Sequence, residues 1–270
     1  MLRLLHKVRR DLLAKKELNR YLWYAIGEIF LLVAGILIAL QINNWNEERI
    51  EQKQIGEYAL SLAGDLKRDI EMLAPIDEQI SHRIARSREF ARYMQGKSLS
   101  EISNIDLYAF TRSPSYRPFG WNRTALEQLK SAGALRQIKN QELVRKISEY
   151  DALTRHLDQD YSNDENHIRE ATGVLMGVVD VNYPHAAKIA EFHEDSIDGL
   201  SSAFFQSDLY RELKNNDLPL LTNDINAVRR AANNFIEMGP FMAPRVENEF
   251  PRVRETGLSI IELIESEYNP

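Results

Sequence analysis

The sequence contains no cysteine among its 270 residues. A disulfide, a thiolate zinc site, an iron–sulfur cluster and a catalytic thiol are therefore excluded, as is a lipid anchor attached through cysteine. Proline and glycine are scarce, with 9 and 12 copies, and no internal repeat or low-complexity run is present. This scarcity of chain-breaking residues indicates long regular elements rather than many turns.

Several catalytic sequence patterns are also missing. The chain has no G-x-S-x-G elbow, no Walker A loop, no G-x-G-x-x-G fingerprint and no H-E-x-x-H motif. We therefore predict that the protein is not an enzyme, and we expect neither a cofactor nor a metal ion.

Positive charge is concentrated in residues 1–20, which hold seven Lys or Arg against two acids, whereas the whole chain has a formal net charge of −6. Basic residues beside an apolar run are typical of a membrane-topology signal, so we expect no nucleic-acid binding. The same segment either serves only as that signal or forms an amphipathic helix on anionic lipid. Its apolar residues recur at three- and four-residue steps: Leu2, Leu5, Val8, Leu12 and Leu13.

One hydrophobic run, from Leu22 to Ile42, has the length of a membrane span. As a helix its 21 residues would extend roughly 32 Å, against a hydrocarbon core of about 30 Å. No polar residue lies between Ile29 and Leu40, whereas a buried core helix would carry polar residues on at least one face. Aromatic residues typical of membrane interfaces flank the run: Tyr21, Trp23, Tyr24 and Trp45. We predict a transmembrane helix over residues 21–45.

The run lacks the small-x-small cleavage site of a signal peptide, because Leu40 and Gln41 stand where small residues are needed. It is therefore predicted to be an uncleaved signal anchor. The positive-inside rule then keeps residues 1–20 in the cytoplasm and exports residues 46–270. We expect a bacterial inner-membrane protein with a periplasmic C-terminal domain.

Glu28 is the one charged residue inside the run. A carboxylate costs a few kcal/mol at mid-membrane and less near an interface. Glu28 is either tolerated, by protonation or by reaching the cytoplasmic headgroups, or used, against a partner helix or a proton path. Gly35 and Ala39 form a small-x-x-x-small pair that would let another helix approach. The predicted partners are the lipid bilayer and a protein, or a second copy, that binds through the span.

The block YAIGEIFLLVAGILIALQINNWNE, residues 24–47, resembles a family of uncharacterised single-pass membrane proteins of Bacteroidetes-type bacteria. A second patch with this resemblance is NRTALEQLKSAGALRQIKNQEL, residues 122–143. The family has no assigned activity, so the resemblance implies topology and class. It also implies that some polar and aromatic residues of the block contact a partner or lipid: Glu28, Gln41, Asn43, Asn44 and Trp45.

The chain after Trp45 shows helical periodicity and no sustained strand alternation. We expect the helix of the span to continue until Pro75 ends it, and a second helix to follow and close at Gly96. Asn122 is predicted to cap a short helix that Gly133 stops. Residues 113–121, with two prolines and a glycine, are predicted to form a loop.

The longest helical pattern begins at Asn140 and holds its spacing for nearly forty residues before Pro184 breaks it. Further helices are expected at Ser207–Lys214, Leu218–Met238 and Glu255–Tyr268, with interruptions between the last two at Pro240, Pro244 and Pro251. The predicted fold class is all-α: an N-terminal transmembrane helix continuing into an exported helical bundle.

Two polar clusters invite a metal-site interpretation. In HLDQDYSNDENH, residues 156–167, Asp160, Asp164 and His167 would share a helix face, but the segment fails as a calcium loop and is interpreted as a solvated polar face. His185 and His193 lie eight residues apart without a zinc pattern around them.

The loop SYRPFGW contains three aromatic residues, Tyr116, Phe119 and Trp121. They either bind a ligand or pack into the bundle, and packing is the favoured interpretation.

Three functional hypotheses follow. The leading one is a membrane-anchored helical interaction or scaffold protein of the bacterial envelope. The second is an exported ligand-sensing domain, which would need a separate transducer because residues 1–20 are too few for an output domain. The third is a proton-coupled membrane component that uses Glu28.

Overall fold

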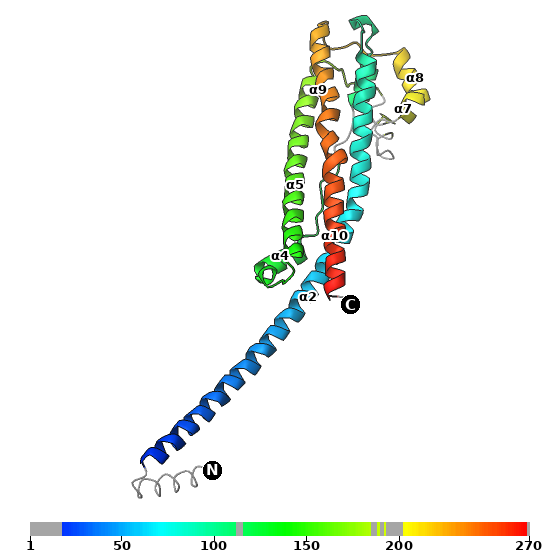
Figure 1. Cartoon of the computed structure of the whole chain (residues 1–270). Coiled ribbons are helices and arrows are strands. Elements are labelled where there is room, and N and C mark those ends of the chain that lie inside the picture. The colour runs from blue at the N-terminus through cyan, green and yellow to red at the C-terminus, as the bar shows by residue number, and fades with distance from the viewer. Residues whose placement is uncertain (1–17, 112–115, 185–187, 190–191, 193–201, 269–270) are drawn as a thin grey trace. The chain divides into compact units, whose positions relative to one another are not determined.

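The computed structural model describes residues 18–111, 116–184, 188–189, 192 and 202–268 (Figure 1). Within these ranges the chain forms α-helices with short 3-10 and π segments and no strand, so the all-α prediction is confirmed. Residues 1–17 of the predicted amphipathic segment lie outside the described residues. The chain divides into two units, Met1–Glu57 and Tyr58–Pro270.

Helix α2 is the longest element and runs over Leu18–Met94. The prediction that Pro75 ends it was wrong, because Pro75 lies inside the helix. A proline removes one N–H and crowds the carbonyl of the residue four positions earlier, here Glu71. Leu73 and Ile76 on either side are buried, and this burial of apolar surface offsets the cost of the lost hydrogen bond.

Local signals located several helix ends correctly. Gly96 and Gly133 have positive φ angles of 75° and 69° just beyond the ends of their helices, a conformation that favours glycine. Asn140 caps α5, which spans Gln141–Leu175, and its side chain accepts hydrogen bonds from the backbone N–H groups of Glu142 and Leu143. These short-range predictions are confirmed.

The predicted Asn122 cap was wrong. Helix α4 spans Thr124–Ser131, and its N-cap position is occupied by Arg123 without a side-chain cap bond. Asn122 instead donates through both its backbone N–H and Nδ2 to Asp69 Oδ1, at 2.8 Å each. Asp65 of α2 accepts from the backbone N–H of Ala125 at 3.2 Å, so a carboxylate from another helix serves the α4 N-terminus.

The C-terminal part forms one continuous helical rod from α9 (Ile225–Pro244) through the π-helix η3 (Arg245–Glu249) to α10 (Phe250–Tyr268). The predicted interruptions at Pro240, Pro244 and Pro251 were therefore wrong. A π-helix widens the turn and shifts the hydrogen-bond pattern. It follows directly after Pro244, so the chain changes its helical geometry here rather than ending the helix.

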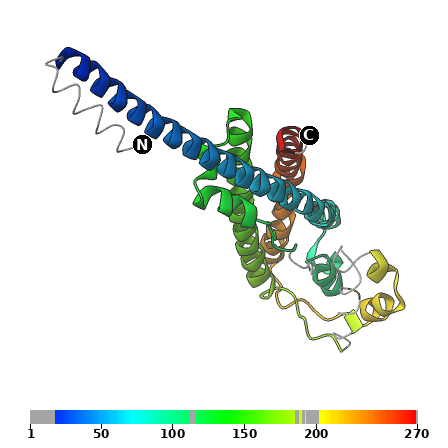
Figure 2. The ribbon, with the colours of Figure 1, turned by 90° about the horizontal axis from the view of Figure 1, so that it is seen from below.

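Three long segments build the core of the second unit: residues 58–94 of α2, α5, and the α9–η3–α10 rod. Lys67, early in the bundle part of α2, contacts Glu265 of α10 at 2.8 Å. Ser87, later in α2, lies so close to Gly239 of α9 that an added Cβ on the glycine would touch it. The rod therefore runs antiparallel to α2 in a three-helix bundle. It also runs antiparallel to α5, beside which it lies in Figures 1 and 2.

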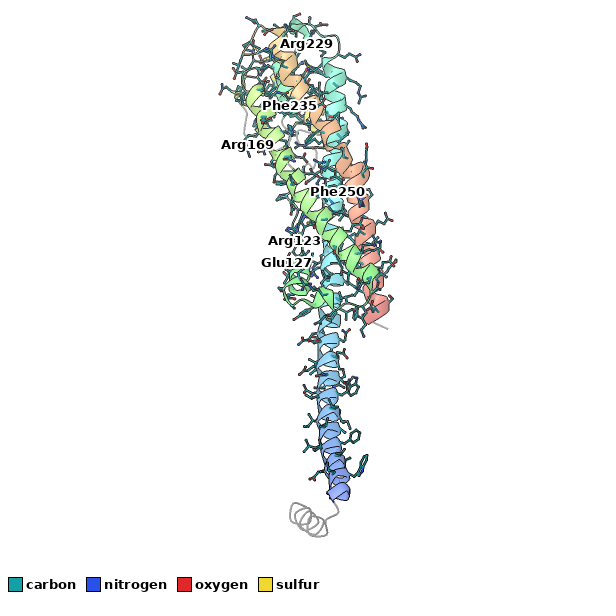
Figure 3. All side chains as sticks on the ribbon, turned by 60° about the vertical axis from the view of Figure 1, so that its left-hand side comes forward. Arg123, Glu127, Arg169, Arg229, Phe235 and Phe250 are labelled. Atoms are coloured by element: carbon teal, nitrogen blue, oxygen red, sulfur yellow. The ribbon has the colours of Figure 1, made fainter. Side chains whose placement is uncertain are left out.

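The connections between the long helices cover the two ends of this bundle. Figure 3 shows Arg123, which directly precedes α4, and Glu127 of α4 where α5 begins, and it shows Arg229 and Phe235 of α9 at the opposite end. A core cluster around Phe90 and Phe204 fills that opposite end. The remaining described elements are η1 (Leu99–Glu101), α3 (Asn104–Thr111), η2 (Ala134–Arg136), α7 (Ser202–Gln206) and α8 (Asp208–Asn215).

Candidate functional site

The apolar part of α2 is the one helix in the described residues that is long and apolar enough to cross a membrane, and none of its apolar window is buried. The exposed fractions of Leu31 and Phe30, for example, are 72% and 70%. Side chains this apolar and this exposed are compatible with a lipid environment.

The predicted contact residues of the span fall on two faces of α2. At 3.6 residues per turn, positions seven and eleven apart nearly coincide around a helix, so Glu28, Gly35 and Ala39 share one stripe. Gln41, Asn44 and Trp45 lie away from that stripe. Asn43, at its edge, donates to Glu47 Oε1 at 2.8 Å. A Cβ added to Gly35 would meet no atom within 4 Å, so this small-residue stripe is open to a neighbouring helix.

A buried ionic cluster lies between α5 and η3 in the second unit. The guanidinium of Arg245 contacts three carboxylates: Asp164 at 3.3 Å, Asp160 at 3.4 Å and Glu249 at 3.3 Å. Asp164 has no exposed surface, and Asp160 and Arg245 are also buried. The interpretation of this α5 face as solvated was therefore wrong. The apolar spacing of α5 continues into the two acids, which signalled that their face turns inward.

The aromatic loop joins this cluster. The Tyr116 hydroxyl donates to Asp164 Oδ2 at 2.6 Å, and the ring packs edge-on against Tyr161 at 5.2 Å. Phe119 stacks on Trp121 and packs edge-on against Phe250 at 5.9 Å. The prediction that the loop aromatics pack into the bundle is confirmed.

The electrostatics of the cluster reflect burial. Burial raises the pKa of Asp164, although the hydrogen bond from Tyr116 and the charge of Arg245 oppose this shift. Burial and the negative charge of Asp160 likewise raise the pKa of Glu249. Burial by itself lowers the pKa of Arg245, but its carboxylate neighbours raise it above its usual value. Arg83 is more fully desolvated, and its pKa falls to about 10.

One edge of this cluster could hold a metal ion. His156, Asp160 and Glu249 each present a ligand atom, and these atoms all lie within 4.8 Å of one another. His167, the histidine of the sequence-based alternative, instead packs on the Phe241 ring at 4.4 Å. His185 and His193 lie outside the described residues. Sequence inspection missed Glu249 because it is 89 residues from Asp160 and carries no local motif.

A pocket of about 580 Å³ opens between α5 and α9. Its polar lining consists of His167, Glu170, Asn234 and Glu237, and no Lys or Arg among the described residues lines it. The apolar lining includes Val174, Met238, Phe241 and Met242. A mostly apolar cavity with a few convergent polar groups has the features of a small-molecule site, and the two glutamates favour a cationic ligand.

Two further polar networks have a structural role. Asp69 accepts from Asn122 and from the Tyr150 hydroxyl at 2.9 Å and thereby joins α2, the loop and α5. At the opposite end Asp106 accepts from Tyr210 at 2.7 Å and from Lys214 at 2.6 Å, which ties α3 to α8. Both carboxylate oxygens of Asp69 and both of Asp106 accept hydrogen bonds, as buried acids require.

Residues 28–117 match a family of unknown function (DUF6090). The matched segment is one third of the chain and includes most of the apolar span, the bundle part of α2 and Tyr116. This similarity agrees with the predicted resemblance to an uncharacterised family. No curated protein and no solved structure matches the chain.

Proposed function

We propose that this chain is a membrane-anchored helical interaction protein of the bacterial envelope, without enzymatic activity. The observation that carries the proposal is the exposed apolar segment of α2, with Glu28, Gly35 and Ala39 in one stripe. Small residues let helix backbones approach closely, and a carboxylate beside them can hydrogen-bond to a partner within the membrane. The span thus serves as anchor and as contact surface, and residues 46–270 form the exported part.

Cross-linking in native membranes tests the contact surface. We expect wild type to give a discrete cross-linked species, either a dimer or a complex with one partner. Glu28→Ala and Gly35→Leu should each reduce its yield at least tenfold, because both change the stripe. Gly27→Leu is the matched control: it lies on a different face, and its added Cβ also meets no atom within 4 Å. A wild-type chain that remains monomeric, or equal loss in all three variants, would contradict the proposal.

A reporter fused after Pro270 tests the proposed topology. We expect alkaline phosphatase at this position to be active, because the basic residues of the N-terminus hold that end in the cytoplasm. Activity of a cytoplasmic reporter at the same position would indicate the reverse orientation and contradict the proposed topology.

The pocket between α5 and α9 favours a second function, the sensing of a small organic cation. A thermal-shift screen of the full chain in detergent, with amines that carry an apolar body, would identify such a ligand by a raised Tm. Gly173→Leu is the control, because the added side chain should fill part of the pocket and abolish the rise in Tm. Gly173 lines the pocket, and an added Cβ there meets no atom within 4 Å. A shift that persists in this filled variant would place the ligand elsewhere.

A further inference from the structure

We propose that His156, Asp160 and Glu249 form a binding site for a divalent transition-metal ion, with Zn²⁺ as the test ion. His156 and Asp160 lie one helical turn apart on α5, and Glu249 is the last residue of η3. The three ligand atoms lie within 4.8 Å of one another. A metal ion here would join α5 to the antiparallel C-terminal rod.

The strongest support comes from two buried oxygens. Asp160 Oδ2 and Glu249 Oε2 are buried and accept no hydrogen bond from the described residues. Asp160 is only 7% exposed, and its Oδ2 lies 3.2 Å from the His156 Nε2, a pair that is ionic only when the imidazole is protonated. A buried carboxylate oxygen without a partner is costly and requires an explanation. A bound cation supplies one.

Arg245 accounts for the other half of each carboxylate. Its guanidinium contacts Asp160 Oδ1 at 3.4 Å and Glu249 Oε1 at 3.3 Å. It also contacts Asp164, which interacts electrostatically with the buried Arg83 as well, so two positive charges stand against these three carboxylates. Arg245 therefore orients the two ligand carboxylates and leaves an excess of negative charge, which a divalent cation would neutralise.

The distances suit a small ion. In a tetrahedral zinc site with bonds of about 2.0–2.2 Å, neighbouring ligand atoms lie about 3.3–3.6 Å apart. His156 Nε2 lies 3.2 Å from Asp160 Oδ2 and 3.9 Å from Glu249 Oε1. Glu249 Oε1 also contacts Arg245 at 3.3 Å, so the Glu249 carboxylate would be shared between the guanidinium and the metal ion.

The ligand set and its exposure indicate the class of metal. An imidazole with two carboxylates suits zinc and its first-row neighbours better than Mg²⁺ or Ca²⁺, which prefer all-oxygen ligands. The His156 side chain is 57% exposed, which leaves a path for entry from solvent and room for water as a fourth ligand.

Equilibrium dialysis of the full chain in detergent, after removal of metal with a chelator, tests the proposal. We expect one zinc ion per chain at this site and a Tm that rises with zinc concentration. His156→Ala and Glu249→Gln should each weaken this binding at least tenfold and remove the rise in Tm. His156 is largely exposed, so its variant is expected to fold.

His167→Ala is the matched control, because His167 is on the same helix but belongs to the pocket and not to the ligand group. It should bind zinc as wild type does. A wild-type chain without stoichiometric zinc, or a His156→Ala variant with unchanged affinity and Tm response, would overturn the proposal. Displacement of the zinc by millimolar Mg²⁺ would also overturn it, since it would indicate an unspecific acidic surface.

Discussion

Asp164 shows at the scale of one residue how the bundle accommodates charge in its core. It has no exposed surface, yet it accepts a hydrogen bond from Tyr116 and faces Arg245. Each of these three groups comes from a different segment: α5, the aromatic loop and η3. The buried acid therefore requires a specific packing of the three segments, because an unpaired charge in the core is far more costly than a paired one.

We predict that Asp164→Ala lowers the free energy of unfolding by about 3–5 kcal/mol, since it leaves the Tyr116 hydroxyl without its acceptor and Arg245 with one carboxylate fewer. Thermal unfolding of the full chain in detergent, followed by circular dichroism, measures the loss. Asp158→Ala is the control on the same helix: its side chain is 40% exposed, and its loss should cost about 1 kcal/mol. Equal effects of the two variants would contradict a special role for the buried cluster.

At the scale of elements, the packing of α9 against α2 depends on one close approach of the two helices. Gly239 of α9 lies so close to α2 that an added Cβ would stand 1.8 Å from Ser87 Oγ and 2.9 Å from Ser87 Cβ. Ser87 is buried, and its hydroxyl donates to the carbonyl of Ile84 at 2.9 Å. Glycine is required here by this approach of the two helices and not by its backbone conformation.

We predict that Gly239→Ala destabilises the bundle by about 1–3 kcal/mol, because α9 and α2 must move apart. The double variant Gly239→Ala/Ser87→Gly should recover part of this loss, because Ser87→Gly removes the side chain that the added Cβ would touch. The measurement compares the Tm of the double variant with that of the Ser87→Gly single variant. Gly173→Ala in α5 is the control: an added Cβ there meets no atom within 4 Å. That change should instead stabilise the helix by about 0.5–1 kcal/mol. Destabilisation by both alanines would point to a general effect of helix glycines.

Pro75 provides a second test at this scale. Because α2 continues through it and its side chain is exposed, Pro75→Ala restores a backbone hydrogen bond without opening a cavity. We expect a gain of about 1–3 kcal/mol in unfolding free energy. Pro219→Ala, in a segment between helices, should change stability by less than about 1 kcal/mol in the unfavourable direction. A loss of stability in Pro75→Ala would mean that the proline itself is needed by the helix.

The whole molecule divides its apolar residues between two units. In Met1–Glu57 the large apolar side chains of residues 22–42 are exposed, whereas most of those described in Tyr58–Pro270 are buried. The first pattern suits lipid and the second suits water. This contrast is the physical basis for assigning membrane attachment to the first unit alone.

We therefore predict that a fragment of residues 58–270 is soluble without detergent, monomeric by gel filtration and cooperative in thermal unfolding. The full chain should require detergent, as judged by its partition into the pellet after ultracentrifugation. Aggregation of the fragment, or solubility of the full chain without detergent, would contradict the assignment of membrane attachment to the first unit alone. The fragment should also retain the stability loss of Asp164→Ala, because all three partners of that cluster lie within it.

The sequence by itself determined the features that depend on neighbouring residues. The apolar span, the all-α class, the Asn140 cap and the glycine stops at Gly96 and Gly133 all rest on side chains within one or two helical turns. Such signals are readable because local backbone conformation and the hydrophobic pattern act over short distances along the chain.

Only the tertiary structure decided the features that depend on distant residues. Helices continue through Pro75 and Pro240, where packing outweighs the lost hydrogen bonds. Asp65 of α2, and not the predicted Asn122, accepts a hydrogen bond from the N-terminus of α4. The tertiary structure also brought Arg245 to Asp160 and Asp164 and so turned an apparently solvated face into a buried ionic cluster. The physical reason is that partners far apart in sequence have no common period or spacing and meet only when the helices pack.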